Sequence, residues 1–186
     1  DLSPSAKRAV LEARGDIFSV PAEKGDVRNL TGTPGVRERA PAWSPDGKWV
    51  AYFSDRSGEY EVHVAGSDGK TPDRQVTKGC DTYRWGLRWS PDSKKLAFSD
   101  KTLTLWYCDV ASGKLTRVDH SDFGEITDFQ WSADSRWLTY AKAFPNWMNQ
   151  VMLYGLESGR TTQVSNGMTE DFSPSFDPLG KYLFFV

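Results

Sequence analysis

Three aspartates recur in one short phrase of this chain and are the first residues to consider for chemistry. Each follows a tryptophan and a serine, in Trp43-Ser-Pro-Asp46, Trp89-Ser-Pro-Asp92 and Trp131-Ser-Ala-Asp134. Carboxylates at a regular spacing can bind a cation or act as general acids and bases. Ser and Asp side chains also hydrogen-bond backbone N–H groups one or two residues on, and Pro and Gly favour a tight reversal. Because the phrase recurs along the chain, we predict a structural turn at all three aspartates.

The two histidines are the next candidates for nucleophilic or metal chemistry. His63 falls on the polar face of a predicted strand, and His120 lies in a predicted loop beside Asp119 and Asp122. Nucleophilic catalysis needs a base within hydrogen-bond reach of a nucleophile, and a group that orients the base. No Gly-x-Ser-x-Gly elbow is present, and adjacent loop residues rarely reach one ion together. We therefore predict no catalytic, metal or cofactor site in this chain.

Four arginines are better candidates for a binding function. Arg84 and Arg88 alternate with the apolar residues of segment 83–89, so a period of two places both on one face of a strand. Arg37 and Arg39 stand just before the corresponding strand of the preceding unit, where they would join the other two at the mouth of a channel. Arginine binds a carboxylate through charge-assisted hydrogen bonds. Its usual structural use is to pair with Asp or Glu, and that alternative stays open here.

The elements that position these residues repeat along the chain. After the three tryptophans, Phe176 takes the same place in the degraded copy Phe176-Asp-Pro-Leu-Gly180, and Leu2 takes it in the partial copy Leu2-Ser-Pro-Ser5. The intervals are 41, 46, 42 and 45 residues, the period of a four-stranded propeller blade. The broad side chain before each turn is expected to pack one blade against the next. The sequence predicts an all-β fold, a β-propeller fragment of about four to five four-stranded antiparallel blades.

The repeat units are about 1–41, 42–88, 89–130 and 131–175, followed by an incomplete unit at 176–186. The first unit lacks most of its innermost strand. Alternation in segment 60–65 predicts a strand with one packed and one polar face. Because innermost strands line the channel of a propeller, the four arginines are expected along it. The predicted strands are 6–13, 16–20, 27–31, one ending at 43, 48–53, 60–65, 73–77, 83–89, 95–99, 103–109, 114–118, 126–131, 137–141, 150–154, 161–164, 171–176 and 181–186.

Composition argues against several partners. A formal net charge of −2 offers no electrostatic case for nucleic acid or an anionic membrane. No apolar run approaches the roughly 20 residues of a membrane helix. Cys80 and Cys108 have no metal-ligand companions, so we expect two unpaired thiols. Four to five blades leave both terminal faces open, and we expect the segment to associate with a second copy or to be one ordered portion of a longer chain.

The repeated phrase and the apolar strand after it resemble the propeller repeat of TolB-like proteins, prolyl-oligopeptidase-type propellers and tricorn-type peptidases. More discriminating stretches are 12–25, 29–36, 90–96 and 105–109. Together they resemble the N-terminal part of the seven-bladed propeller of tricorn-type serine peptidases, over essentially the whole chain.

The resemblance implies a non-catalytic role. In that family the propeller guides or filters peptides toward a separate serine-peptidase domain, and the peptidases form large cytoplasmic oligomers. The implied partners are peptides or unfolded polypeptide, the remaining blades and a peptidase domain, and the implied location is the cytoplasm, with the periplasm left open. No family catalytic residue maps onto this chain, so hydrolysis would belong to the parent protein. The alternative is a TolB-like scaffold for protein–protein interactions, since the generic repeat serves many functions.

Overall fold

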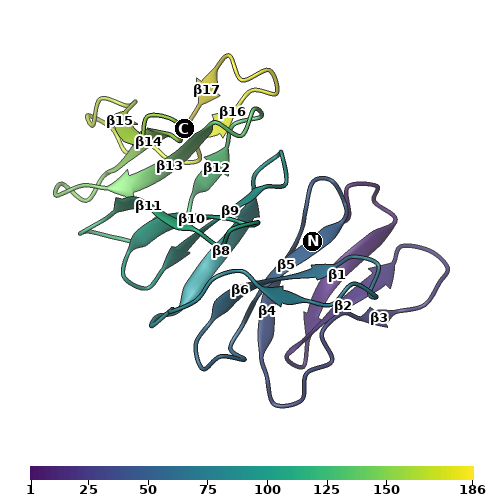
Figure 1. The fold of residues 1–186 in the computed structure, drawn as a ribbon. Coiled ribbons are helices and arrows are strands. Elements are labelled where there is room, and N and C mark those ends of the chain that lie inside the picture. The colour runs from purple at the N-terminus through teal and green to yellow at the C-terminus, as the bar shows by residue number, and fades with distance from the viewer.

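The computed structural model describes residues 1–186, and every regular element in it is a β-strand. Seventeen strands form five antiparallel sheets that follow one another along the chain (Figure 1). Three sheets have four strands, the first has three and the last has two. The prediction of an all-β propeller fragment is confirmed. The chain contains no helix long and apolar enough to span a membrane.

Each sheet takes its strands from one consecutive stretch, paired in chain order. The first contains β1 (Arg8–Ala13), β2 (Asp16–Pro21) and β3 (Arg28–Asn29), and the second contains β4 (Glu38–Trp43), β5 (Trp49–Ser54), β6 (Glu61–Gly66) and β7 (Arg74–Gln75). The third contains β8 (Arg84–Trp89), β9 (Lys95–Asp100), β10 (Thr104–Asp109) and β11 (Leu115–His120). The fourth contains β12 (Phe129–Trp131), β13 (Trp137–Ala143), β14 (Asn149–Gly155) and β15 (Arg160–Gln163), and the last β16 (Ser175–Phe176) and β17 (Leu183–Phe184).

The sheets begin a few residues before the repeat units counted from the phrase, because the phrase marks the end of an innermost strand. In the first sheet only an isolated bridge between Leu2 and Ala9 stands in the innermost place, as predicted. The outer strands β3 and β7 are shorter than predicted, with two residues each. A hydroxyl ends the ladder there: Thr31 Oγ1 accepts the Ile17 N–H at 3.1 Å, and Thr77 Oγ1 accepts the Val62 N–H at 2.9 Å.

The hydrophobic core lies between sheets. One cluster joins the second and third sheets, another the third and fourth, and a smaller one the first and second. All six residues of β6 are buried, so the predicted polar face of this strand is wrong. A sheet between two others packs on both faces. The alternation of apolar and polar residues does not show whether the polar face is buried or exposed to solvent. Cys80 and Cys108 are free, which confirms the two unpaired thiols.

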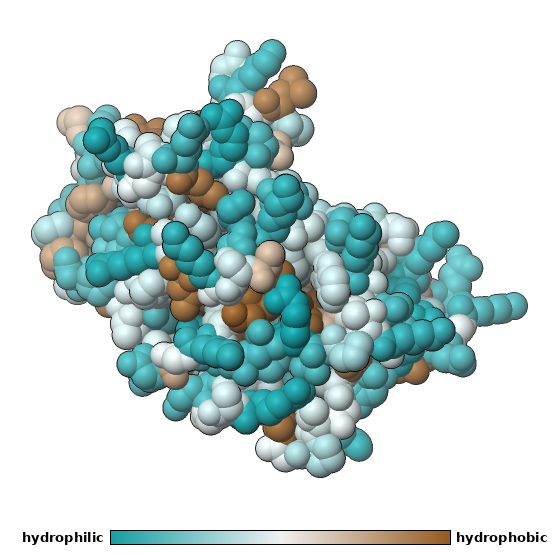
Figure 2. Space-filling view, viewed as in Figure 1, coloured by the Kyte–Doolittle hydropathy of each residue, from teal (hydrophilic) through white to brown (hydrophobic).

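The last sheet differs because no further sheet covers it in this chain. Figure 2 shows a brown, apolar area among hydrophilic side chains on the projection at the top, where β16 and β17 lie in Figure 1. Tyr182, Phe184 and Val186 are exposed there. Apolar area of this kind is buried at the three boundaries between the first four sheets.

Each repeated phrase folds into the same hydrogen-bonded turn. Ser44 Oγ donates to Asp46 Oδ1 at 2.6 Å, and this oxygen accepts the Lys48 N–H at 3.0 Å. Ser44 Oγ also accepts the Trp49 N–H at 2.9 Å. The same bonds recur in the next two turns, around Asp92 and Asp134. The carboxylates therefore close the turns, and the Ser132 hydroxyl lowers the pKa of Asp134 below its ordinary value.

The tryptophans of the phrase connect neighbouring sheets. Trp89 Nε1 donates to the Ala42 carbonyl of the preceding inner strand at 3.0 Å, and Trp131 Nε1 donates to the Arg88 carbonyl at 3.2 Å. Both side chains are buried, so each covers apolar area and satisfies a polar group across the boundary. Trp43 is buried as well, but its Nε1 has no partner because the first sheet has no full inner strand.

Serine replaces glycine at the last position of two turns. Gly47 has a φ of 72°, and the corresponding Ser93 and Ser135 have φ of 58° and 61°, a left-handed conformation that is strained for residues with a Cβ. Ser93 Oγ accepts the Asp46 N–H, and Ser135 Oγ accepts the Asp92 N–H, both at 3.0 Å. Each serine offsets its backbone strain with a hydrogen bond to the turn of the preceding blade.

Ser93→Ala is expected to lower the free energy of unfolding by about 1 kcal/mol, because it keeps the strained φ and removes the bond to Asp46. Ser93→Gly removes strain and bond together, so its effect should be smaller. Urea unfolding followed by tryptophan fluorescence measures both. A glycine variant less stable than the alanine variant would contradict this balance.

Candidate functional site on the innermost strands

A bulge interrupts the innermost strands shortly before the tryptophan. The pairing of β4 with β5 and of β8 with β9 shifts register there. Three positions before the tryptophan φ is left-handed, 53° at Ala40 and 71° at Gly86. A Cβ at Gly86 would lie 3.0 Å from the Phe129 ring, and glycine adopts this φ without strain, so glycine suits this place. The bulge breaks the period of two. The prediction that Arg84 and Arg88 share a face is therefore wrong, since Arg84 is buried and Arg88 is exposed.

Arg84 makes a buried ion pair with the preceding blade. Its Nη1 donates to Glu61 Oε2 and to Thr77 Oγ1, both at 2.8 Å. Thr77 Oγ1 donates to Glu61 Oε2 at 2.5 Å, and Glu61 Oε1 accepts the Cys80 N–H at 2.6 Å. Arg84 and Glu61 are only 5% and 2% exposed, so the pair is desolvated, and both carboxylate oxygens of Glu61 accept hydrogen bonds. The charge of Arg84 is thus neutralised within the protein, as in the alternative that the sequence left open.

Arg39 lies among aromatic rings. Its guanidinium carbon is 3.8 Å from the centroid of Tyr83, 4.4 Å from that of Tyr60 and 5.3 Å from that of Phe53. Its Nη2 donates to the carbonyl of Arg84. Burial lowers the pKa of Arg39, and the tyrosines act against this shift. The ring faces stabilise the cation, and Arg39 holds the starts of β4 and β8 together.

The other two arginines extend into solvent. Arg37 precedes β4 and is exposed, and its backbone N–H donates to Asp55 Oδ1 at 2.8 Å. Arg88 is exposed on β8 and forms no ion pair. Gln130 holds the equivalent place on β12 and is also exposed. Arg88 and Gln130 line one depression of about 270 Å³ between neighbouring innermost strands, with Trp89, Pro91, Phe129 and Trp131.

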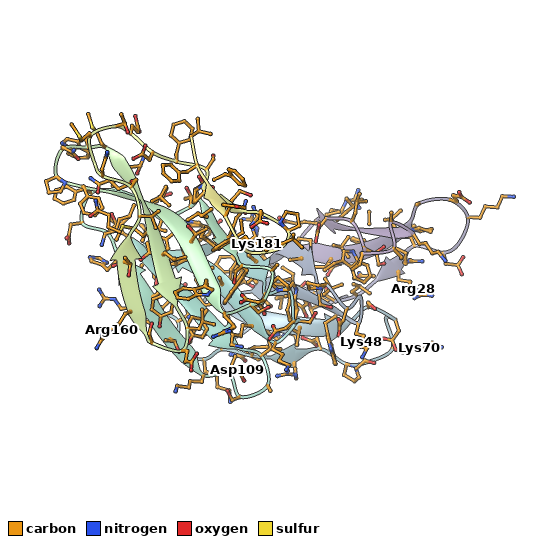
Figure 3. All side chains as sticks on the ribbon, turned by 90° about the horizontal axis from the view of Figure 1, so that it is seen from above. Arg28, Lys48, Lys70, Asp109, Arg160 and Lys181 are labelled. Carbon is orange, nitrogen blue, oxygen red and sulfur yellow. The ribbon has the colours of Figure 1, made fainter.

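The structure therefore brings Arg39 and Arg84 into contact and leaves Arg37 and Arg88 apart from them. In Figure 3 the labelled charges Lys48, Lys70 and Arg160 point away from the sheets, whereas Arg39 and Arg84 are buried. Sequence reasoning missed the partners of the buried arginines, namely Glu61, Thr77, Tyr60 and Tyr83. The sequence did contain a signal for the ion pair: an acidic residue in the third strand of one blade, Glu61, and an arginine at the start of the next blade, Arg84.

The second sheet also contains a buried polar network around His63. Its Nδ1 lies 3.1 Å from Asp73 Oδ2, which accepts the Tyr52 hydroxyl at 3.0 Å. The Tyr52 and His63 rings stack with centroids 5.7 Å apart. Arg56 lies 3.2 Å from Asp73 and 3.8 Å from the buried Glu38. Burial lowers the pKa of His63, and its bond to Asp73 offsets this only in part. The imidazole is therefore neutral near pH 7 and joins β5, β6 and the segment before β7.

His120 lies at a surface position. Its Nε2 is 3.4 Å from Asp122 Oδ1, and its Nδ1 is 3.2 Å from Thr104 Oγ1. Asp119 has other partners: its carboxylate accepts hydrogen bonds from Tyr140 at 2.7 Å and from Lys142 at 3.0 Å. No group of three or more His, Cys, Asp or Glu side chains is arranged to hold a metal ion.

Arg84→Ala is expected to lower the free energy of unfolding by about 3–5 kcal/mol, because it leaves the Glu61 carboxylate buried without its cation. Adding Glu61→Gln should restore part of the loss, since the amide carries no charge. Arg88→Ala is the matched control and should change stability by no more than about 0.5 kcal/mol. Urea titrations of the four proteins measure these differences, and a fully stable Arg84→Ala variant would refute the role of the pair.

Lowering the pH from neutral is expected to destabilise the protein through His63. Its folded pKa lies below the ordinary value of about 6.5, so the unfolded chain binds a proton first. The stabilisation is complete above pH 6.5 and falls as the pH drops below it. The pKa of Asp73 is lowered too, its hydrogen bonds from His63 and Tyr52 outweighing burial, but Asp73 adds to the loss only below about pH 4.

Thermal unfolding midpoints between pH 5 and 8 test this for the wild type and for His63→Gln. The variant should show a flatter dependence on pH in the acid half of the range. An identical slope in both proteins would show that another group is responsible.

The fold and the inner-strand arrangement define a β-propeller built from Trp-Ser-Pro-Asp repeats. A family model described as the tricorn protease second beta propeller domain matches residues 1–186. The chain belongs to this family.

The relatives are much longer proteins. The chain is 27% identical to "Tricorn protease homolog 1" of Streptomyces coelicolor, with 98% of this chain and 18% of the relative covered. It is also 27% identical to "Tricorn protease homolog" of Saccharolobus solfataricus, with 95% and 16% covered. The chain thus spans less than a fifth of the length of these relatives.

Solved structures show the same fold. The crystal structure of the tricorn protease aligns with a TM-score of 0.87 at 17% identity, covering 96% of this chain and 18% of that one. TolB from Acinetobacter baumannii aligns with a TM-score of 0.62 at 16% identity, covering all of this chain and 45% of that one. The tricorn likeness, with the family match, identifies this chain as a tricorn-type propeller segment.

Proposed function

We propose that this chain is the non-catalytic propeller segment of a tricorn-like serine peptidase, and that it guides peptides along its innermost strands toward a peptidase domain of the same protein. Membership in the propeller family and the similarity to tricorn protease homologues support this proposal. The observation that carries it is Arg88, an exposed arginine without an acidic partner on an innermost strand.

Arg88 has the chemistry to bind a passing peptide. Its guanidinium can donate two parallel hydrogen bonds to a carboxylate, either the peptide terminus or an acidic side chain. Gln130, in the equivalent place on the next blade, offers both a donor and an acceptor for a peptide bond. Arg39 and Arg84 act differently, since they are buried and position the strands that present Arg88.

The second candidate is a TolB-like scaffold for protein–protein interactions, favoured by the structural likeness to TolB. The two functions differ in their dependence on Arg88. A scaffold binds its partner with or without this side chain, whereas a peptide guide loses selectivity for extended substrates.

In the full-length protein, Arg88→Ala should lower kcat/KM for long acidic peptides about tenfold, the effect of losing one charge-assisted hydrogen bond. Turnover of short fluorogenic substrates, which do not need the channel, should stay unchanged. Arg136→Ala is the matched control, because Arg136 is an exposed arginine paired with Glu157 at 3.3 Å away from the inner-strand site. Steady-state kinetics with both substrate classes measure the change in kcat/KM for long peptides and for short ones.

Unchanged kinetics on long peptides in Arg88→Ala and Arg88→Glu would refute the guiding role. Equal losses on long and short substrates would point to a general effect on the peptidase rather than to peptide binding by the propeller. Circular dichroism and urea unfolding of each variant would show that the fold is intact.

A further inference from the structure

Three loops meet at one end of the fourth sheet and form an apolar surface. They are the loop before β12, the β13–β14 hairpin and the loop after β15. The Phe123 ring meets the Trp147 ring edge to face, with centroids 6.1 Å apart. A Cβ at Gly124 would lie 3.5 Å from the Cβ of Ala143, so the first loop packs on the end of β13. Asn149 Nδ2 donates to Glu170 Oε1 at 3.3 Å, which ties the third loop to the hairpin.

Trp147 occupies a backbone position that suits glycine. Its φ is 61°, and its N–H donates to the Phe144 carbonyl at 2.8 Å to close the hairpin turn. The same turn position holds Gly58, with φ of 106°, in the second sheet and Leu103, with φ of 61°, in the third. A bulky residue in this conformation costs about 1–2 kcal/mol. The indole is 74% exposed, so burial in the core does not offset that cost.

The three loops also carry exposed methionines and exposed carboxylates. Met168 is 81% exposed and Met148 is 38% exposed. Lys142 is paired with Asp119 at 3.0 Å, so its positive charge is compensated. The exposed carboxylates of the three loops are Asp122, Glu125 and Glu170. We call this surface the Trp147 patch: Phe123, Phe144, Trp147, Met148 and Met168, with the three carboxylates as its rim.

We propose that the Trp147 patch binds an extended basic and apolar polypeptide segment. An aliphatic or aromatic side chain of the ligand packs on Trp147 and the flexible methionines, and flanking Lys or Arg residues contact the acidic rim. Tryptophan and methionine are the residue types that protein-binding surfaces favour. The charge of the rim selects a cationic partner over an acidic one. This site lies outside the innermost strands and does not depend on the proposed peptide-guiding function.

The experiment measures fluorescence anisotropy of three labelled peptides with the full-length protein: Lys-Leu-Lys-Phe-Lys, Glu-Leu-Glu-Phe-Glu and Lys-Ser-Lys-Ser-Lys. The first should bind, and the other two should bind at least about tenfold more weakly. Trp147→Gly should weaken binding of the first peptide at least tenfold while leaving the unfolding midpoint equal or higher, because glycine fits this φ. Leu103→Gly, the same change in the third sheet, should leave binding unchanged.

The rim is tested by Asp122→Asn combined with Glu170→Gln, which should weaken binding several-fold and reduce its dependence on salt. Wild-type affinity in Trp147→Gly, or equal binding of the acidic and basic apolar peptides, would overturn the proposal. So would light scattering that showed a dimer of the wild type lost in Trp147→Gly, since the occupant would then be a second copy of the chain.

Discussion

Contact between successive sheets is the constraint on which the rest of the structure depends. A four-stranded sheet in this chain cannot bury its own faces, and each apolar cluster is shared by two sheets. The repeated phrase supplies that contact twice over. Its tryptophan donates to a backbone carbonyl across the boundary, as Trp89 does to Ala42, and its turn residue accepts a backbone N–H across it, as Ser93 does from Asp46. Stability is then a sum of neighbour interfaces, as in other repeat proteins.

The same boundaries account for the fate of the charged residues. Where two sheets close over a side chain, its charge must be compensated, and the protein does this with Glu61 for Arg84 and with aromatic rings for Arg39. Arg88 needs no such compensation because the bulge at Gly86 places it at an exposed position of β8. Its exposure is therefore a consequence of how its neighbours are packed.

Turn positions with a left-handed backbone recur in several blades, and the residues at these positions have different roles. Ser93 and Ser135 use a strained turn position to reach the preceding blade. Trp147 uses another strained position to hold an indole in solvent, where Gly58 stands in the second sheet. The backbone arrangement of strands and turns is common to the blades, and the blades differ in the side chains at its turn positions. A binding site on such an arrangement is best sought where a residue departs from the repeat.

The sequence by itself predicted about four to five blades in chain order, the strand-turn-strand phrase and the turn role of Asp46, because these features follow from a short local pattern that repeats. Only the tertiary structure decided which polar side chains are buried. The period of two showed that His63 alternates with apolar residues, but its burial depends on a sheet that packs over it. The separation of Arg84 from Arg88 likewise depends on the bulge between them, which shifts the pairing of β8 with β9. Contacts between residues far apart in the chain leave no local pattern, and the site is made from such contacts.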